Sequence, residues 1–113
     1  MHELSLVMEV IDLVSKEAGK SKILSILELE IEVGYLSGVD ADAFQSALEM
    51  MVQGTLLENS RLAIIRTPAT GRCKPCDLEF TMQERLAVCP ACQAFPSEIS
   101  GGQEFRVLSL LVE

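Results

Sequence analysis

Apolar and polar residues follow two different periods along this chain, and the first period covers residues 2–18. Apolar side chains recur there at three- and four-residue steps, while most charged residues fall on the other side. The apolar positions are Leu4, Val7, Met8, Ile11, Val14 and Ala18. This spacing predicts an amphipathic helix, and Gly19 with the lysines around it suits the C-terminal end of that helix.

A period of two follows in residues 23–34, ILSILELEIEVG. The apolar residues Leu27, Leu29, Ile31 and Val33 alternate strictly with Glu28, Glu30 and Glu32. The alternation predicts a strand with one buried face and one acidic face in water. Gly34 and Gly38 mark the turn that follows this strand.

Three further elements are expected after this turn. A second helix is predicted to begin after Asp40, with an inward face made of Phe44, Ala47, Leu48, Met51 and Leu56. The pattern of residues 61–70, RLAIIRTPAT, predicts a strand that ends at Pro68, and residues 101–113, GGQEFRVLSLLVE, predict another strand. Apolar side chains on both faces of this last strand favour a well-covered position in the sheet.

Residues 71–100, between the last two predicted strands, differ from the rest of the chain. They are richer in Cys and Pro and have no long apolar period, so they need a cross-link such as a metal ion to be stable. The order of elements predicts an α+β protein with a small three-stranded sheet packed with two helices. Residues 1–70 and 101–113 would form this domain, and residues 71–100 would be a module inserted into it.

Four cysteines define the chemistry of the inserted module. Cys73 and Cys76 lie in CKPC, Cys89 and Cys92 in CPAC, with 12 residues between the two pairs. Each pair is a turn that brings two thiolates to one ion, and two such turns complete a tetrahedral four-sulfur site. Zn(II) is favoured because it is redox-inert and accepts four thiolates, although iron fits the same geometry. With no open position, the site is expected to be structural.

A redox-active pair is the competing interpretation of a single Cys-x-x-Cys motif. Two such pairs within thirty residues, without a surrounding βαβ pattern, argue against it. A zinc ribbon that binds nucleic acid is the other competitor. The chain carries 9 Lys and Arg against 17 Asp and Glu, a net charge of −8, and this acidic balance disfavours a nucleic-acid partner.

Composition also bears on the compartment and on catalysis. No apolar run in the 113 residues approaches the ~18 residues of a membrane span, and the N-terminal residues lack the features of a secretory signal. We therefore expect a cytoplasmic protein, without a membrane partner, whose cysteines stay reduced or bind metal. An enzyme is not expected, because the chain has a single histidine and no evident nucleophile paired with a base.

That single histidine, His2, stands beside the N-terminus. The α-amine of Met1, the amide nitrogen of His2 and the imidazole Nδ1 of His2 can close adjacent chelate rings around one ion. Three such nitrogens suit Ni(II) or Cu(II), which favour square-planar or tetragonal nitrogen-rich sites. The competing interpretation is a solvated histidine at the start of a helix, where Glu3 is favoured by the helix dipole.

The chain resembles the HypA/HybF family of nickel metallochaperones, which assist the maturation of NiFe hydrogenases. The stretches that carry the resemblance are MHEL at the start, GYLSGVDADAF at residues 34–44, CKPC with CPAC, and GGQEFRVLSLLVE at the end. The resemblance implies a nickel site that includes His2, Glu3 and Asp40, and a zinc site formed by Cys73, Cys76, Cys89 and Cys92. It also implies docking to a HypB-type GTPase and to the hydrogenase large subunit, to which Ni(II) is delivered.

Several alternatives stay open at this level. Asp40 is a good N-cap for the second helix, but Asp42 is an alternative cap that would leave Asp40 available to the metal. The pattern permits either a monomer or a strand-exchanged homodimer. The competing function is a zinc-ribbon adaptor that only binds proteins, with His2 incidental.

Overall fold

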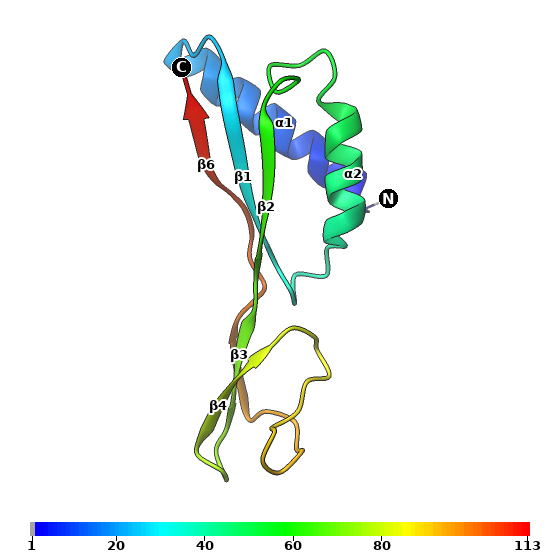
Figure 1. Cartoon of the computed structure of the whole chain (residues 1–113), viewed down its shortest axis with the longest axis vertical. Helices are drawn as coiled ribbons and strands as arrows, with labels where there is room; N and C mark the ends of the chain where they lie inside the picture. The colour runs from blue at the N-terminus through cyan, green and yellow to red at the C-terminus, as the bar shows by residue number, and fades with distance from the viewer. Residues whose placement is uncertain (1) are drawn as a thin grey trace. The chain divides into compact units, whose positions relative to one another are not determined.

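The computed structural model of the protein describes residues 2–113, and for His2 it describes the backbone only. Within this range the chain forms two helices and six strands (Figure 1). They are α1 (His2–Ser21), β1 (Ile26–Gly34), α2 (Ala41–Met51), β2 (Arg61–Thr67), β3 (Ala69–Cys73), β4 (Leu78–Met82), β5 (Glu98–Gly101) and β6 (Phe105–Val112). The predicted α+β class is confirmed, and the strands form two three-stranded sheets.

The first sheet has the strand order β2-β1-β6. Near the start of β1 and β2, Arg61 Nε lies 3.7 Å from Glu28 Oε2. Near their ends, the Thr67 hydroxyl donates a hydrogen bond to Glu32 Oε2 at 2.6 Å. The two strands therefore run in the same direction, and α2 lies in the crossover connection that a parallel pair requires.

β6 lies on the other side of β1 and forms an edge of the first sheet (Figure 1). The backbone N–H of Glu113 donates to Ser25 O, and the N–H of Gly34 donates to Glu104 O. Residue numbers rise along β6 as they fall along β1, so these two strands are antiparallel.

The prediction that the last strand occupies a well-covered position is wrong. Leu108, Leu111 and Val112 of β6 are 42%, 57% and 41% exposed. Apolar residues on both faces are typical of strands inside a sheet. The strand order places β1 in that position, which periodicity within one strand does not reveal.

The acidic face of β1 is only partly in water, which corrects the expectation from its alternating pattern. Glu32 is 9% exposed and accepts the hydrogen bond from Thr67 of β2. Glu28 contacts the same strand, and Glu30 Oε1 accepts from the Ser109 hydroxyl of β6 at 2.6 Å. The neighbouring strands supply the polar partners that a buried carboxylate needs.

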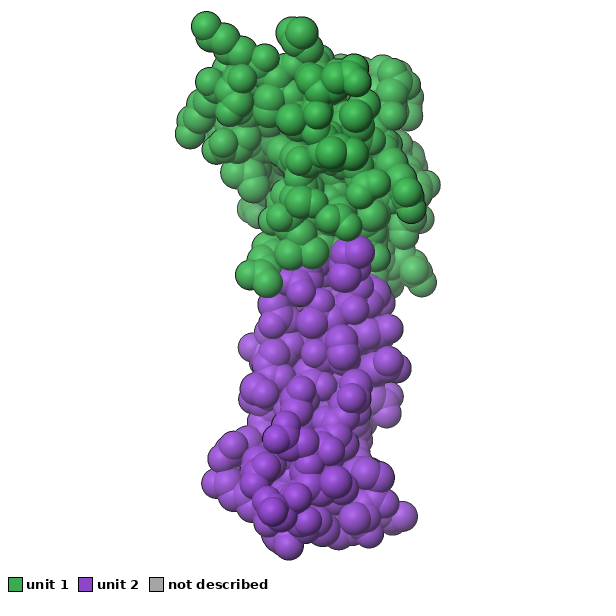
Figure 2. Space-filling view, turned by 60° about the vertical axis from the view of Figure 1, so that its left-hand side comes forward, with its two compact units in different colours: residues 1–31, 39–64, 106–113 green, residues 32–38, 65–105 purple. Residues whose placement is uncertain are grey.

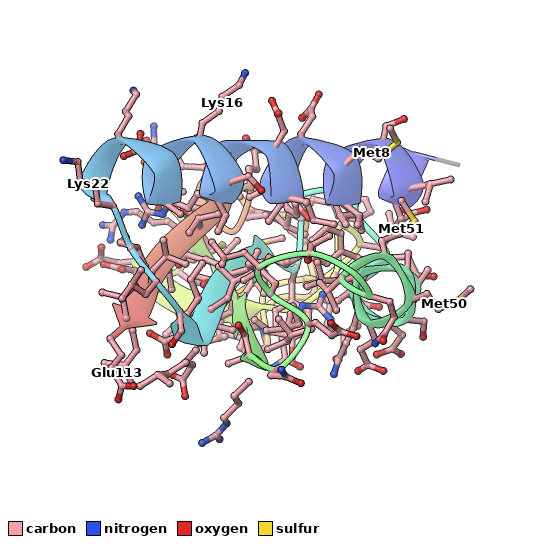
Figure 3. All side chains as sticks on the ribbon, turned by 90° about the horizontal axis from the view of Figure 1, so that it is seen from above. Met8, Lys16, Lys22, Met50, Met51 and Glu113 are labelled. Atoms are coloured by element: carbon pink, nitrogen blue, oxygen red, sulfur yellow. The ribbon has the colours of Figure 1, made fainter. Side chains whose placement is uncertain are left out.

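The two helices pack against each other. Their buried apolar faces consist of Val7, Val10, Val14 and Ala18 in α1, and Ala41, Phe44 and Leu48 in α2. Met8, Met51 and Leu56 were predicted to face inward but are 57%, 38% and 39% exposed. Met8 and Met51 lie side by side where the helices meet (Figure 3) and line a groove together with Ile11. They sit at the margin of the apolar stripe, where periodicity alone does not decide burial.

The second sheet has the order β4-β3-β5, and both neighbours pair antiparallel with β3. Ala69 lies opposite Met82 of β4 and Gly101 of β5. The core beside this sheet is formed by Leu36, Ala69 and Met82, with Phe80 and Ala87 packed against them. The sequence did not predict this sheet, because strands of four or five residues are too short to show a clear period.

The chain separates into two compact units (Figure 2). Unit 1 comprises residues 1–31, 39–64 and 106–113 and contains both helices. Unit 2 comprises residues 32–38 and 65–105 and contains the second sheet and the four cysteines. It extends beyond residues 71–100 on both sides and includes the end of β1. Neither helix of the described chain has the length and apolar character needed to cross a bilayer.

Candidate metal centres

The first pair of cysteines lies in the turn from β3 to β4. Cys73 is the last residue of β3, and the backbone N–H of Asp77 donates to Lys74 O at 3.1 Å. Asp77 has a φ of 50°, in the left-handed region that Asp tolerates better than most residues. The chain thus changes direction directly after Cys76.

The second pair lies between β4 and β5 and has a different hydrogen-bond pattern from the first. The N–H of Gln93 donates to Cys89 O at 2.7 Å, and the N–H of Cys89 donates to Ala94 O at 2.8 Å. Gln93 has a φ of 63° and follows Cys92 directly, as its counterpart does in the first turn. Both Cys-x-x-Cys turns therefore end in a residue with a positive φ.

The two turns bring all four sulfur atoms into one cluster. The Sγ atoms of Cys73, Cys76, Cys89 and Cys92 lie within 4.8 Å of one another. Cys73 Sγ and Cys92 Sγ, from different turns, are 3.6 Å apart. A tetrahedral ion with metal–sulfur bonds of about 2.3 Å needs sulfur atoms about 3.8 Å apart, so the cluster fits such an ion. Cys73 and Cys89 are buried, whereas Cys76 and Cys92 are exposed.

Neighbouring groups of the cluster shift the pKa values of Cys73, Cys76 and Cys89. A hydrogen bond from the Cys92 backbone N–H is the main reason that the pKa of Cys89 is lowered to about 7. The pKa of Cys76 is raised to about 12, chiefly by its hydrogen bond with the Cys92 side chain. For Cys73, a hydrogen bond from the Cys76 backbone N–H lowers the pKa, but burial and the Cys92 side chain outweigh this effect. The pKa of Cys73 is therefore raised. A divalent cation would compensate the charge of the thiolates, so the donor set suits a metal such as zinc.

Charged side chains near the first cysteine turn are paired with one another. Arg72 pairs with Asp77 and lies 3.7 Å from Glu79, and Lys74 lies 3.0 Å from Glu98. These side chains are 39% to 83% exposed, so each pair contributes at most about 1 kcal/mol. Both cations of this turn therefore have acidic partners.

Glu3, which the resemblance predicts to be a nickel ligand, contacts the start of α2. Glu3 lies in the first turn of α1, and its Oε2 accepts a hydrogen bond from the Asp40 backbone N–H at 3.3 Å. This contact joins two residues that are 37 positions apart. Met1 and the side chain of His2 lie outside the described residues, so their role in binding nickel stays a prediction.

Asp40 is the N-cap of α2. Its Oδ1 accepts a hydrogen bond from the Ala43 backbone N–H at 3.1 Å. Asp42 lies in the first turn of the helix, so the structure selects Asp40 from the two candidate caps. Asp40 is exposed, and capping uses one of its two carboxylate oxygens. The capping role therefore does not exclude a second role as a metal ligand.

The connection between β1 and α2 has contacts that the sequence pattern does not reveal. Leu36 enters the core of unit 2, and Arg85, from between the two cysteine pairs, donates from Nη2 to Leu36 O at 3.2 Å. A Cβ atom at Gly34 would overlap the backbone of Gly102. In the sequence, Gly34 and Gly38 indicated that the chain turns here. They did not indicate which residues the turn contacts.

Comparison with known proteins identifies close relatives along the whole chain. The model of the HypA family, which covers hydrogenase/urease nickel incorporation metallochaperones, matches residues 1–112. The hydrogenase maturation factors HypA of Geobacter metallireducens and Geotalea daltonii are 39% and 38% identical to the chain, with 100% and 99% of both proteins covered. The solution structure of the Ni metallochaperone HypA from Helicobacter pylori is 28% identical and has a TM-score of 0.64, covering 97% of this chain and 96% of its own.

Proposed function

Because the chain belongs to the HypA family of nickel metallochaperones, we propose that it binds Ni(II) at its N-terminus and delivers the ion to the large subunit of NiFe hydrogenase. The observation that carries the N-terminal site is the hydrogen bond from Asp40 N–H to Glu3 Oε2, which joins the starts of the two helices. A carrier of this kind binds and releases its ion without turnover. No catalytic step is assigned to the chain.

The proposed nickel ligands are nitrogen atoms of Met1 and His2, with the carboxylates of Glu3 and Asp40 as further ligands. α1 begins at His2, and the first N–H groups of a helix have no acceptor within that helix. The metal can therefore replace the proton of the His2 amide, which is released to solvent, without the loss of a helical hydrogen bond. The charge of Glu3 offsets the positive end of the helix dipole, which would otherwise disfavour a cation.

Zn(II) at the cysteine cluster has a structural role in this proposal. The ion would be held by Cys73, Cys76, Cys89 and Cys92, and it would cross-link the two turns that carry them. Four thiolate ligands leave no open position for water or substrate, so the site supports folding of unit 2.

Delivery of nickel requires partner proteins. On the basis of family membership we assign this role to a HypB-type GTPase and to the hydrogenase large subunit, in the cytoplasm. Glu3 is half-buried and Asp40 is exposed. A receiving protein can thus approach the ligands, which a closed four-ligand site would not permit.

Titration of tag-free protein with Ni(II), after its zinc content has been measured, tests the proposal. The native chain is expected to bind one nickel ion tightly. His2→Ala and a copy extended by a few residues before Met1 are expected to lose this binding, because each disrupts the set of terminal nitrogen ligands. Equal binding by the native and extended chains, or none by either, would favour a zinc-ribbon adaptor without a nickel role.

A matched pair of variants separates the two roles of Asp40. Asn caps helices as well as Asp does, so Asp40→Asn keeps the N-cap while it removes the charge. Asp42→Asn removes a neighbouring charge of the same helix turn and serves as the control. Weaker nickel binding in Asp40→Asn alone is expected if Asp40 is a ligand, whereas equal binding by both variants would restrict Asp40 to its capping role.

A further inference from the structure

Three methionine side chains are exposed on the two helices of unit 1. Met8 of α1 is 57% exposed, and Met50 and Met51 of α2 are 75% and 38% exposed. Met8 and Met51 lie side by side where the helices meet, whereas Met50 points away from them (Figure 3). Large apolar side chains that are exposed next to one another are typical of binding surfaces. Neither proposed metal site uses these three methionines, so their exposure indicates another role.

Met8 and Met51 belong to opposite walls of a groove between the two helices. The lining residues are Met8, Ile11, Asp12 and Ser15 of α1, with Met51 at the end of α2 and Thr55 in the turn after it. Leu4, one helical turn before Met8, extends the apolar wall along α1 and is 38% exposed. The groove has a volume of about 320 Å³, near the lower end of the range for binding pockets. It is therefore large enough to take apolar side chains of a partner.

Both walls of this groove come from helices, which restricts the kind of partner that it can take. Backbone N–H and C=O groups inside a helix are bonded within that helix, so they cannot pair with an extended chain. A partner helix satisfies its own backbone and presents apolar side chains at three- and four-residue steps. Methionine suits such a surface because its unbranched thioether side chain adapts to different shapes. The groove thus fits the apolar face of a helix.

The charges beside the groove determine which polar residues this helix should carry. Residues 2–15 and 41–58, which include both walls, contain no Lys and no Arg. Their acidic residues are Glu3, Glu9, Asp12, Asp42, Glu49 and Glu58. The next cation along α1 is Lys16, whose Nζ lies 3.0 Å from Asp12 Oδ2. Basic residues of a partner would meet complementary charge here, whereas a second copy of these helices or an anionic lipid surface would be repelled.

We propose that this groove docks a basic amphipathic helix of a partner protein, with Met8 and Met51 as the central apolar contacts. Apolar side chains of the partner helix pack between these two methionines, and its Lys or Arg residues face Asp12 and the acidic residues beside the groove. None of the residues that line the groove is a proposed metal ligand. Docking at this surface is therefore a function in addition to the binding of nickel and zinc.

NMR of the methionine methyl groups in the full-length, zinc-loaded and nickel-free protein tests this docking. The probe is a synthetic amphipathic peptide of about 18 residues, with leucines at helical spacing on one face and lysines on the other. The peptide is expected to shift the methyl signals of Met8 and Met51. The signals of Met50, which points away from the groove (Figure 3), and of Met82, which is buried in unit 2, are expected to stay unchanged.

Two neighbouring methionines of α2 provide a matched pair of variants. Met51→Gln is expected to weaken peptide binding by about fivefold or more, because it replaces an apolar contact with a polar side chain. Met50→Gln makes the same change one residue away, outside the groove, and is expected to leave binding unchanged. Both positions are exposed and Gln is a good helix former, so both variants are expected to stay folded.

A second peptide separates the effect of charge from that of apolar contact. Replacement of every lysine by glutamate is expected to abolish detectable binding, because the residues beside the groove are acidic. No binding of the lysine peptide, equal binding of the glutamate peptide, or equal weakening by Met50→Gln and Met51→Gln would each overturn the proposal. All of these measurements use nickel-free protein, so their outcome is independent of the nickel titration.

Discussion

The cysteine cluster of unit 2 and the helix starts of unit 1 differ in how the fold assembles potential metal ligands. Two turns gather four sulfur atoms within 4.8 Å, and two of the cysteines are buried. The helix starts are joined at the surface by a hydrogen bond of 3.3 Å between Asp40 N–H and Glu3 Oε2. A closed set of four soft ligands retains its ion and stabilises the fold. A site at the exposed surface suits an ion that has to be passed on.

The largest expected effect comes from Cys73→Ser, which removes a buried member of the cluster. A hydroxyl replaces a thiolate ligand, and zinc supplies roughly 10–16 kcal/mol of apparent folding free energy in small zinc domains. Zinc content is expected to fall from one ion per chain to nearly none, with rapid hydrogen exchange throughout the second sheet. Metal analysis and hydrogen–deuterium exchange check this, and α1 and α2 should keep their protection. A variant that retains its zinc would show that Cys73 is not needed to hold the ion.

The next effect concerns the core that packs beside the cysteine turns. Leu36→Ala is expected to reduce the free energy of unfolding of unit 2 by about 2–5 kcal/mol, because Leu36 is 4% exposed in the cluster with Ala69 and Met82. Urea denaturation, with hydrogen exchange as the probe of unfolding, measures this loss. Leu24→Ala, at an 87% exposed position, is the control and should change stability by less than about 0.5 kcal/mol. Equal stability of the two variants would mean that zinc alone holds unit 2 together.

Zinc affinity is expected to rise with pH, by about 100-fold or more from pH 7 to pH 8. The pKa of Cys76 is raised to about 12 and the pKa of Cys73 is also raised, so both thiols keep their protons at neutral pH. Zinc displaces at least these two protons, and each contributes a factor of about ten per pH unit. The Cys89 thiol, with a pKa of about 7, is largely ionised above pH 7, so it contributes less to the rise in zinc affinity. Competition with a chromophoric chelator measures the slope, and affinity that is flat or falls with pH would contradict this account.

The smallest effect is expected at the helix starts of unit 1. Asp40→Ala removes the N-cap of α2 and should reduce the free energy of unfolding of unit 1 by about 1 kcal/mol. Asp40→Asn should cost no more than a few tenths of this value, because Asn also accepts from the Ala43 N–H. Thermal and urea unfolding of the two variants distinguish these outcomes. Equal destabilisation by both would show that the charge, and not the cap, contributes the stability.

Features that depend on neighbouring residues in the sequence were predicted well. The helix in residues 2–18, the alternation in residues 23–34 and the two cysteine motifs all have local patterns, and the structure contains each of them. Burial at the margins was predicted less well: Val10, which was not among the predicted inward positions, is buried, whereas Met8, which was, is exposed. The packing of α2 against α1 changes which residues at the margin are buried. The position of α2 depends on the whole fold.

The sequence by itself determined the two helices, the first strand and the turns that carry the cysteines, because helical and strand periods and the Cys-x-x-Cys spacing act within a few residues. Only the tertiary structure decided that Glu3 meets Asp40, that Glu32 is buried against Thr67, and that Arg85 holds the backbone of Leu36. It also decided that β6, with apolar residues on both faces, lies at an edge. These contacts join residues at least 35 positions apart. They depend on strand order and packing, which no period along the chain encodes.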